Sequence, residues 1–364
     1  MQEIVPIIKI VSMKCNLRCT YCYYREEDQN ATKIMNLKSL KELIKKTLNI
    51  FSGRVQFIWH GGEPLLVGID FYREVLRLQQ LYKKESHQII NALQTNATLL
   101  TEVWVKFLKD NSFNVGVSCD GPEKYHNKCR RNKQNTGTFQ GVFRGIKLLQ
   151  AKGINPHVIM IVTKDKLKSP KEIYKFFYEN NLSFHPKPCL EINPKTNRLS
   201  AYSITPEEYT KFMIKIFDLW METDNPDFKI RNLNNILTGL LGGKPNLCEF
   251  NGRCQKFLTV DYNGDIGACD SFPLQKFRFG NILKDDWFSI LKSDNYKRYF
   301  ECIKLSRQDC KGCEWLMVCK GGCLRYSYAR GENQWHKNIF CESRKKLFNY
   351  VAKKLKEIEF QGTS

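Results

Sequence analysis

Hydrophobic residues in the first half of the chain alternate between short runs rich in β-branched side chains and longer stretches with helical spacing. The short runs show little alternation with polar residues, which predicts buried parallel strands. They occupy residues 4–11, 55–59, 89–93, 115–118 and 158–162, and a sixth begins at 182–184. The stretches at residues 37–51 and 71–81 predict helices before and after the second of these strands.

This alternation of strands and helices predicts an α/β fold. Strands separated by helices pair in parallel through right-handed crossovers, and six of them would form an open relative of the eight-fold barrel, a partial (β/α)6 barrel. In such barrels the reactive groups lie at the C-terminal ends of the strands. A later apolar stripe with helical spacing is expected to be core. It consists of Tyr209, Phe212, Met213, Ile216, Phe217 and Trp220.

The pattern changes after Asn234, where glycines are followed by nine cysteines from Cys248 to Cys341. A segment with so many potential metal ligands is held together by metal as much as by packing. We therefore predict a partial barrel at residues 1–235 and a Cys-rich domain with a C-terminal helix at residues 236–364. A chain of 364 residues is also long enough for a large domain and a smaller one.

Four short motifs follow the first four predicted strands, so they are expected at one rim of the barrel. The first is Cys15-x3-Cys19-x2-Cys22, and the others lie at residues 61–64, 94–98 and 118–122. Three thiolates at this spacing can hold one iron–sulfur cube and leave its fourth iron open to a bidentate small molecule. From the spacing alone, the alternative is a zinc knuckle that lacks its last ligand.

The three-cysteine loop, with an aromatic residue before its last cysteine, resembles the radical S-adenosylmethionine (SAM) superfamily. Gly-Gly-Glu-Pro at residues 61–64 resembles its methionine-binding motif, in which glycines let the backbone approach the ligand and the carboxylate helps to hold an amine. Within this superfamily the chain resembles the anaerobic sulfatase-maturating enzymes of the SPASM subgroup over nearly its whole length. The resulting candidate SAM contacts are Tyr21, Gly61, Gly62, Glu63, Ser118, Arg130 and Leu190.

The distal cysteines resemble the SPASM signature, which implies two auxiliary [4Fe-4S] clusters with four thiolates each. In the family pattern the first cluster takes Cys248, Cys254, Cys269 and Cys323, and the second takes Cys310, Cys313, Cys319 and Cys341. With the three-cysteine loop this makes three [4Fe-4S] clusters. The alternative is two zinc sites built from the same cysteines. Four cysteines remain and are expected to be buried thiols: Cys119, Cys129, Cys189 and Cys302.

Asp270 directly follows the implied cluster ligand Cys269. The resemblance implies that its carboxylate is the catalytic base that takes a proton from the substrate side chain; an arbitrary aspartate would be a surface or capping residue. His60 stands where some relatives have glutamine, and we expect it to pack or to form hydrogen bonds. The segment at residues 185–191 differs from the relatives at the rim where substrate would lie, which bears on the identity of the substrate.

The resemblance implies an oxidoreductase that converts a Cys or Ser side chain of a sulfatase to formylglycine. The reduced open cluster would cleave SAM to a 5′-deoxyadenosyl radical that removes a Cβ hydrogen, and the second electron would leave through the auxiliary clusters. The implied partners are a protein or peptide substrate and a flavodoxin- or ferredoxin-type electron donor. A second hypothesis is a maturase that crosslinks a ribosomally made peptide. Only fourteen residues precede Cys15, too few for the leader-binding module of many such maturases, which favours the first hypothesis.

Charge suggests a third hypothesis, a zinc-stapled basic protein that binds RNA. The chain has 58 Lys and Arg against 37 Asp and Glu, a net charge of +21. The excess is spread as single lysines over helix faces, which is typical of a solvated surface, so no nucleic acid is expected. No run of eighteen apolar residues and no signal-peptide pattern occurs, so no membrane partner is expected either. Fifteen cysteines, many at metal-ligand spacings, suit the cytoplasm.

Overall fold

The computed structural model describes residues 3–22, 24, 33–193, 198–328 and 337–362. Its contacts divide the chain into two compact units, each assembled from separate segments. Unit 1 consists of Met1–Cys119, His126–His157 and Gln255–Glu301; unit 2 consists of Asp120–Tyr125, Val158–Cys254 and Cys302–Ser364. These units cut across the domains expected at residues 1–235 and 236–364, and that boundary stays a prediction.

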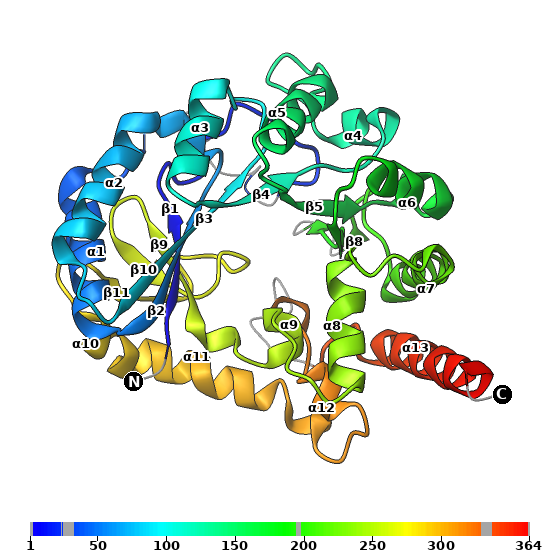
Figure 1. Cartoon of the computed structure of the whole chain (residues 1–364). Helices are drawn as coiled ribbons and strands as arrows, with labels where there is room; N and C mark the ends of the chain where they lie inside the picture. The colour runs from blue at the N-terminus through cyan, green and yellow to red at the C-terminus, as the bar shows by residue number, and fades with distance from the viewer. Residues whose placement is uncertain (1–2, 23, 25–32, 194–197, 329–336, 363–364) are drawn as a thin grey trace. The chain divides into compact units, whose positions relative to one another are not determined.

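Unit 1 contains four consecutive strands that alternate with helices. Each strand pairs in parallel with the next: β1 (Val5–Lys9), β2 (Gly53–His60), β3 (His87–Thr95) and β4 (Asn114–Ser118). The connecting helices lie along one side of these strands (Figure 1): α1 (Leu37–Ile50), α2 (Ile69–Tyr82) and α3 (Glu102–Asp110). For this unit, the parallel order predicted from the hydrophobic pattern is confirmed.

The first strand is shorter than the predicted range 4–11. Ile10 and Val11 belong to a buried turn instead, because Ser12 adopts a positive φ of 49° and its N–H donates back to the Lys9 carbonyl at 3.2 Å. The turn directs the chain into the three-cysteine loop. Both residues are buried, as their apolar side chains indicated. The hydrophobic pattern therefore predicted their burial correctly but placed the end of the strand two residues too late.

Three strands that the sequence analysis missed extend this sheet beyond β1. β9 (Phe257–Asp261) runs parallel to β1, and the antiparallel strands β10 (Asp265–Gly267) and β11 (Arg278–Asn281) follow. The strand order in unit 1 is therefore β11-β10-β9-β1-β2-β3-β4, and Figure 1 shows β9 beside β1. No helical pattern separates these three strands from one another, and nothing in the pattern reveals a partner so distant in sequence.

Polar contacts join the first helix to this late segment of unit 1. Lys46 Nζ donates to the carbonyls of Ile282 and Asp285 at 2.6 and 2.9 Å, and Trp287 Nε1 donates to Thr47 Oγ1 at 3.0 Å. The other helices of the unit are α5 (Phe139–Ala151) and α10 (Trp287–Lys292). Two helices run from one unit into the next along the chain, α4 (Glu123–Cys129) and α11 (Asp294–Leu305).

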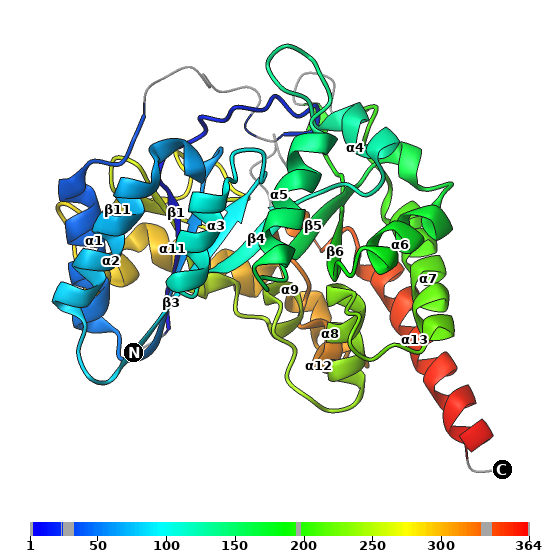
Figure 2. The same cartoon turned by 45° about the horizontal axis from the view of Figure 1, so that its top comes forward.

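Unit 2 contains the parallel pair β5 (His157–Val162) and β6 (Phe184–Pro188), joined through α6 (Pro170–Glu179). Two long helices, α7 (Pro206–Thr223) and α13 (Cys341–Gly362), lie side by side (Figures 1 and 2). Most of the apolar stripe on α7 is buried, as predicted for core residues. The remaining elements are α8 (Arg231–Leu240), α9 (Cys248–Asn251), α12 (Leu316–Cys319) and the hairpin of β7 (Ile192–Asn193) and β8 (Arg198–Leu199).

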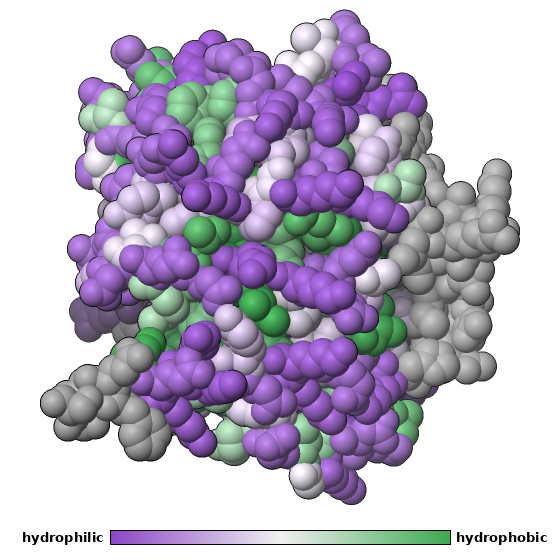
Figure 3. All heavy atoms as spheres, turned by 90° about the vertical axis from the view of Figure 1, so that its right-hand side faces the viewer, coloured by the Kyte–Doolittle hydropathy of each residue, from purple (hydrophilic) through white to green (hydrophobic). Residues whose placement is uncertain are grey.

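Figure 3 shows one face of the molecule, on which hydrophilic residues predominate and hydrophobic ones form small patches between them. Among the described residues, no helix combines the length and the apolar character needed to cross a membrane.

Candidate active site

The three-cysteine loop of unit 1 is anchored by backbone hydrogen bonds to the segment after α4. Arg18 N donates to Arg131 O at 2.7 Å, and Thr20 N donates to Cys129 O at 2.9 Å. Within the loop, Cys15 Sγ accepts from Leu17 N at 3.4 Å. Burial raises the pKa of the Cys15 thiol to about 12, and the nearby Glu63 adds to this shift. Binding of a metal must therefore displace a proton from this sulfur.

An amide network that the sequence analysis did not assign supports the same loop. Asn96, just after β3, directs its Nδ2 at Cys15 Sγ (3.7 Å) and at Asn16 Oδ1 (2.9 Å). Asn16 Nδ2 in turn donates to Thr98 Oγ1 at 2.8 Å. The motif at residues 94–98 thus contacts the cysteine loop, as expected for neighbours on one rim. An N–H directed at a ligand sulfur is the kind of contact that tunes a bound cluster.

The glycines of the Gly-Gly-Glu-Pro motif pack against the chain's own cysteine loop. Gly62 N donates to Ser12 O at 2.8 Å, and Glu63 N donates to Lys14 O at 2.9 Å. A Cβ added to Gly62 would lie 2.0 Å from Lys14 O, and one added to Gly61 would lie 2.8 Å from Ser12 O. The glycines are therefore also required by the backbone that leads into the loop, and their contact with SAM stays a prediction.

Replacing Gly62 by alanine should destabilise unit 1 by about 1 to 3 kcal/mol, the usual cost of overpacking, and displace the cysteine loop. The displaced atom is a backbone oxygen, which cannot swing aside as a side chain can. Chemical denaturation measures the free energy of unfolding. Iron content after anaerobic reconstitution measures whether the cysteine loop still binds its cluster. Gly141→Ala is the matched control, because its Cβ would meet only ordinary contacts with Thr98, at 3.5 Å and beyond. Equal stability and iron content in the two variants would contradict the prediction.

Glu63 is fully buried and joins two rim loops. Its Oε1 accepts from Thr95 Oγ1 at 2.7 Å and from Leu65 N at 3.1 Å, while its Oε2 accepts from Asn96 N at 2.7 Å. Burial raises the pKa of Glu63 to about 7, although these three hydrogen bonds oppose the shift. Its protein contacts therefore fix the geometry of the loops after β2 and β3.

Two other candidate SAM contacts of unit 1 lie beside the cysteine loop. The Arg130 guanidinium sits 5.4 Å from the centre of the Tyr21 ring, and Arg130 is held by the same segment that anchors the loop. Ser118, at the end of β4, accepts from Gln94 Nε2 at 3.2 Å, which links the third and fourth rim motifs. Unit 1 thus gathers six of the seven candidate SAM residues. Leu190 belongs to unit 2, and the SAM-binding roles remain predictions.

Asp270 lies beside both Cys269 and His60 in unit 1. Its Oδ1 is 3.3 Å from Cys269 Sγ, and its Oδ2 is 3.8 Å from His60 Nδ1 at the end of β2. The carboxylate is mostly buried, with 14% of the side chain exposed. His60 therefore contacts the predicted base, a pairing that sequence reasoning could not find because the partner follows β10, one of the missed strands.

Three implied ligands of the first auxiliary cluster lie close together in unit 2. Burial, Cys323 and Cys254 raise the pKa of Cys248, and burial and Cys254 raise the pKa of Cys323 to about 11. These contributions come from sulfurs that lie near one another in unit 2. The fourth implied ligand, Cys269, belongs to unit 1. Its membership of this set stays a prediction.

The four implied ligands of the second auxiliary cluster line one cavity of unit 2. The cavity is partly open to solvent. Its lining includes Cys310, Cys313, Cys319 and Cys341 together with Arg344 and Lys337. Among the described residues, no group of three or more His, Cys, Asp or Glu is close enough to hold a single metal ion. A cube of four irons and four sulfides separates its ligands more widely than one ion does, so a cluster suits this cavity.

No disulfide joins any of the fifteen cysteines, all of which lie in the described residues. Of the four that no cluster claims, Cys119, Cys129 and Cys189 are buried, as expected, whereas Cys302 is partly exposed.

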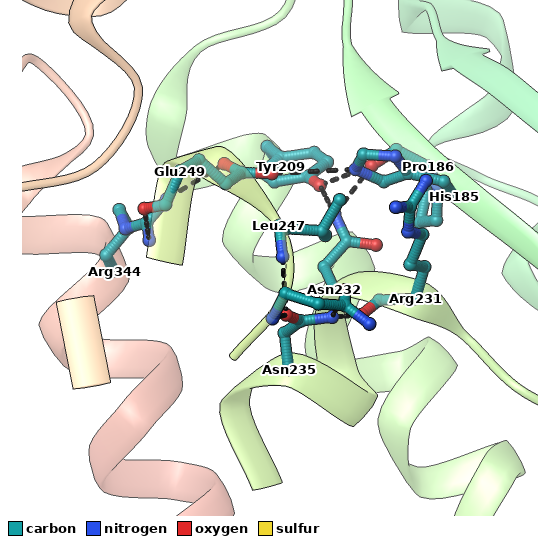
Figure 4. Close-up of polar contacts among 10 residues, drawn as sticks. His185, Pro186, Tyr209, Arg231, Asn232, Asn235, Leu247, Glu249 and Arg344 are labelled. Carbon is teal, nitrogen blue, oxygen red and sulfur yellow. Dashed lines mark hydrogen bonds and ion pairs between the residues drawn. The ribbon is translucent and has the colours of Figure 1, made fainter. Parts of the chain in front are cut away.

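The segment at residues 185–191 is only partly at a rim. His185 is buried within β6, where its Nε2 is 3.5 Å from Glu249 Oε1 (Figure 4). Burial lowers the pKa of His185 to about 4, so the ring is neutral near pH 7. Beyond the strand, Glu191 forms an ion pair with Arg325, whose guanidinium also reaches the Leu190 carbonyl. His185 is therefore a packing residue, and only residues after Pro188 follow the strand end.

Comparison with known proteins places this geometry in a family. A model of the radical SAM superfamily matches residues 10–177, and a model of the SPASM iron–sulfur cluster-binding domain matches residues 248–314. The chain is 33% identical over 360 residues to the cysteine-type anaerobic sulfatase-maturating enzyme of Clostridium perfringens (strain 13 / Type A), covering 96% of each chain. The serine-type enzyme of Bacteroides thetaiotaomicron is 30% identical over 369 residues, covering 95% of this chain and 89% of that one.

A solved structure agrees with these matches. Native anSMEcpe with bound AdoMet and Cp18Cys peptide superposes with a TM-score of 0.90 at 32% identity, covering 98% of this chain and 99% of the other. The chain is thus a radical SAM enzyme with a SPASM domain, which confirms the predicted fold class, and its cofactors are iron–sulfur clusters and SAM. It belongs to the anaerobic sulfatase-maturating enzymes.

Proposed function

We propose that this protein oxidises a cysteine side chain in a sulfatase to formylglycine. The observation that carries the proposal is the similarity, over nearly the whole chain, to cysteine-type sulfatase-maturating enzymes. Serine-type relatives match at lower identity, which favours cysteine over serine as the target. The solved relative holds both AdoMet and a peptide, which supports a peptide segment as the substrate.

The cysteines divide into three sets, which we assign to three [4Fe-4S] clusters. Cys15, Cys19 and Cys22 hold the cluster with an open iron, and the two four-cysteine sets hold the auxiliary clusters. When bound, the reduced open cluster and SAM supply a 5′-deoxyadenosyl radical that removes a hydrogen atom from the target Cβ. The chain itself holds this pair in place: Glu63 and Asn96 fix the rim loops, and Arg130 and Tyr21 flank the cysteine loop.

Asp270 is assigned as the base that receives the thiol proton of the substrate. Its position supports this role, because the carboxylate is largely buried and lies between His60 and Cys269. A thiol has a pKa near about 8.5, so a carboxylate deprotonates it far more easily than an alcohol. The electron released by the substrate then has an acceptor next to the base, if Cys269 ligates an auxiliary cluster.

Two further assignments belong to the proposal. The reducing electron is assigned to a flavodoxin- or ferredoxin-type donor, the kind of partner that the family resemblance implies. The cytoplasm is the compartment, because fifteen cysteines without disulfides suit a reducing environment.

A peptide assay tests the function. A synthetic peptide with Cys followed at short spacing by Pro and Arg, incubated anaerobically with the enzyme, dithionite and SAM, should be converted to an aldehyde. Mass spectrometry detects the replacement of the thiol sulfur by a carbonyl oxygen, and a hydrazide reagent detects the aldehyde. The Ser version should react more slowly, because its hydroxyl proton is harder to remove.

The matched control is the same peptide with alanine in place of the cysteine, which should stay unmodified. A Cys peptide that remains intact while SAM is cleaved would contradict sulfatase maturation. An internal crosslink in a peptide encoded beside this gene would instead favour the peptide-maturase alternative.

A further inference from the structure

A mostly buried arginine of unit 2 lies at the cavity of the second cysteine set. Arg344 stands three residues after Cys341 in the first turn of α13, lines the cavity and exposes 12% of its side chain. Its Nη1 donates to Glu249 Oε2 at 3.1 Å, and its Nη2 donates to Glu249 O at 3.3 Å. The guanidinium also stacks 4.4 Å from the centre of the Phe250 ring. These contacts hold it in one position (Figure 4).

One donor of this guanidinium remains for a ligand in the cavity. Arg344 Nε is buried and forms no hydrogen bond within the described part of the chain. Burial alone would lower the pKa of Arg344, but the nearby Cys319 sulfur and the Glu249 carboxylate together raise it. The guanidinium therefore lies next to a sulfur of the second set with an N–H to spare. A buried donor without a partner is unfavourable unless a bound group satisfies it.

The partner of Arg344 belongs to the other cysteine set. Glu249 directly follows Cys248 at the start of α9, and its charge contributes to the raised pKa of both Cys248 and Cys323. His185 contacts the opposite carboxylate oxygen at 3.5 Å and fixes its orientation. The ion pair is thus oriented, with its negative end beside the Cys248 set and its positive end beside the Cys319 set.

We infer that the Glu249–Arg344 ion pair orders the reduction potentials of the two auxiliary clusters. Arg344 donates to sulfur at the second cluster and stabilises its reduced form, whereas Glu249 disfavours the reduced form of the first. An electron that enters the Cys248 set is thereby driven on to the Cys319 set. This inference rests on the cluster ligands assigned above, and it makes Arg344 and Glu249 positioning residues that act through the clusters.

Redox titration of the full chain, monitored by electron paramagnetic resonance, tests the inference. The titration uses the variant with Cys15, Cys19 and Cys22 replaced by alanine, so that only the auxiliary clusters contribute signal. Arg344→Met should lower the equilibrium constant for reduction of the second cluster about tenfold, equivalent to about 59 mV for one electron. Glu249→Gln should shift the first cluster in the opposite direction, toward easier reduction. Arg344→Lys should keep part of the raised potential of the second cluster, because lysine retains the positive charge but lacks the planar set of donors of the guanidinium.

Lys346→Met is the control, since Lys346 is 65% exposed, is absent from the cavity lining and pairs only loosely with Glu207 at 3.9 Å. It should leave both potentials unchanged. If the ion pair had a purely structural role, Arg344→Met and Glu249→Gln would shift the reduction potentials of the auxiliary clusters in the same direction or leave them unchanged. Either result overturns the inference.

A single charge left buried could prevent folding, so the double variant Arg344→Met/Glu249→Gln provides a second measurement. It keeps the pair neutral and removes the donor, and the potential of its second cluster should still fall. An unchanged potential in this folded, iron-loaded variant overturns the inference. Peptide conversion by the wild-type enzyme distinguishes failure of this inference from failure of the proposed function. If the wild type converts the peptide but the variants leave the potentials unchanged, only the role of the ion pair is refuted. If the wild type does not convert the peptide, the proposed function is refuted.

Discussion

Replacing Cys15, Cys19 and Cys22 together by alanine should abolish cleavage of SAM and remove about a third of the roughly twelve irons expected for three clusters. Only this set has three thiolates, so only its cluster leaves an iron open to SAM. The structure adds that the loop is anchored at Arg18 and Thr20 by backbone hydrogen bonds. These bonds do not involve the sulfurs, and the triple variant should therefore fold.

Iron analysis and the yield of 5′-deoxyadenosine are the two measurements. The matched control replaces Cys119, Cys189 and Cys302, three cysteines that no cluster claims, and it should keep all the iron and the SAM cleavage. SAM cleavage that survives in the Cys15, Cys19 and Cys22 variant would remove the basis of the site assignment. Loss of all iron in that variant would mean that the three sets depend on one another for assembly.

Local pattern predicted β1 to β4 because a hydrophobic run marks each strand and helical patterns separate them. It failed for β9, β10 and β11, which no helical pattern separates and whose neighbour β1 lies at the other end of the chain. Missing these strands also concealed one contact of the candidate active site. Without β9 and β10, nothing in the sequence indicates that Asp270 lies 3.8 Å from His60.

The candidate residues themselves were found by motif, but their contacts were not. Motif reasoning gave Gly62 a role toward a ligand, which stays a prediction, but it did not indicate the close approach of Gly62 to the Lys14 carbonyl, a tertiary contact that no local pattern encodes. Likewise Asn96 and Arg344 are ordinary polar residues in the sequence. They become candidates only where folding places an amide 3.7 Å from Cys15 Sγ and a guanidinium beside Cys319.

Replacing Asp270 by asparagine should leave SAM cleavage intact and slow formation of formylglycine by about 10² to 10⁴-fold, the usual contribution of a general base. Hydrogen abstraction from Cβ does not need the carboxylate, whereas removal of the thiol proton does. Asparagine has nearly the shape of aspartate and can still contact His60 and Cys269, so the iron content should not change. Peptide conversion and 5′-deoxyadenosine, measured in the same reaction, separate the two steps.

Asp294→Asn is the matched control for this experiment, because Asp294 also lies in unit 1 but exposes 89% of its side chain. It should convert peptide at the wild-type rate. Uncoupling is the signature that identifies Asp270 as the base: 5′-deoxyadenosine accumulates while the aldehyde does not. If Asp270→Asn forms aldehyde at the wild-type rate, the carboxylate is only a structural neighbour of Cys269. If it loses iron instead, the contact of 3.3 Å between Asp270 Oδ1 and Cys269 Sγ supports the cluster and not the proton transfer.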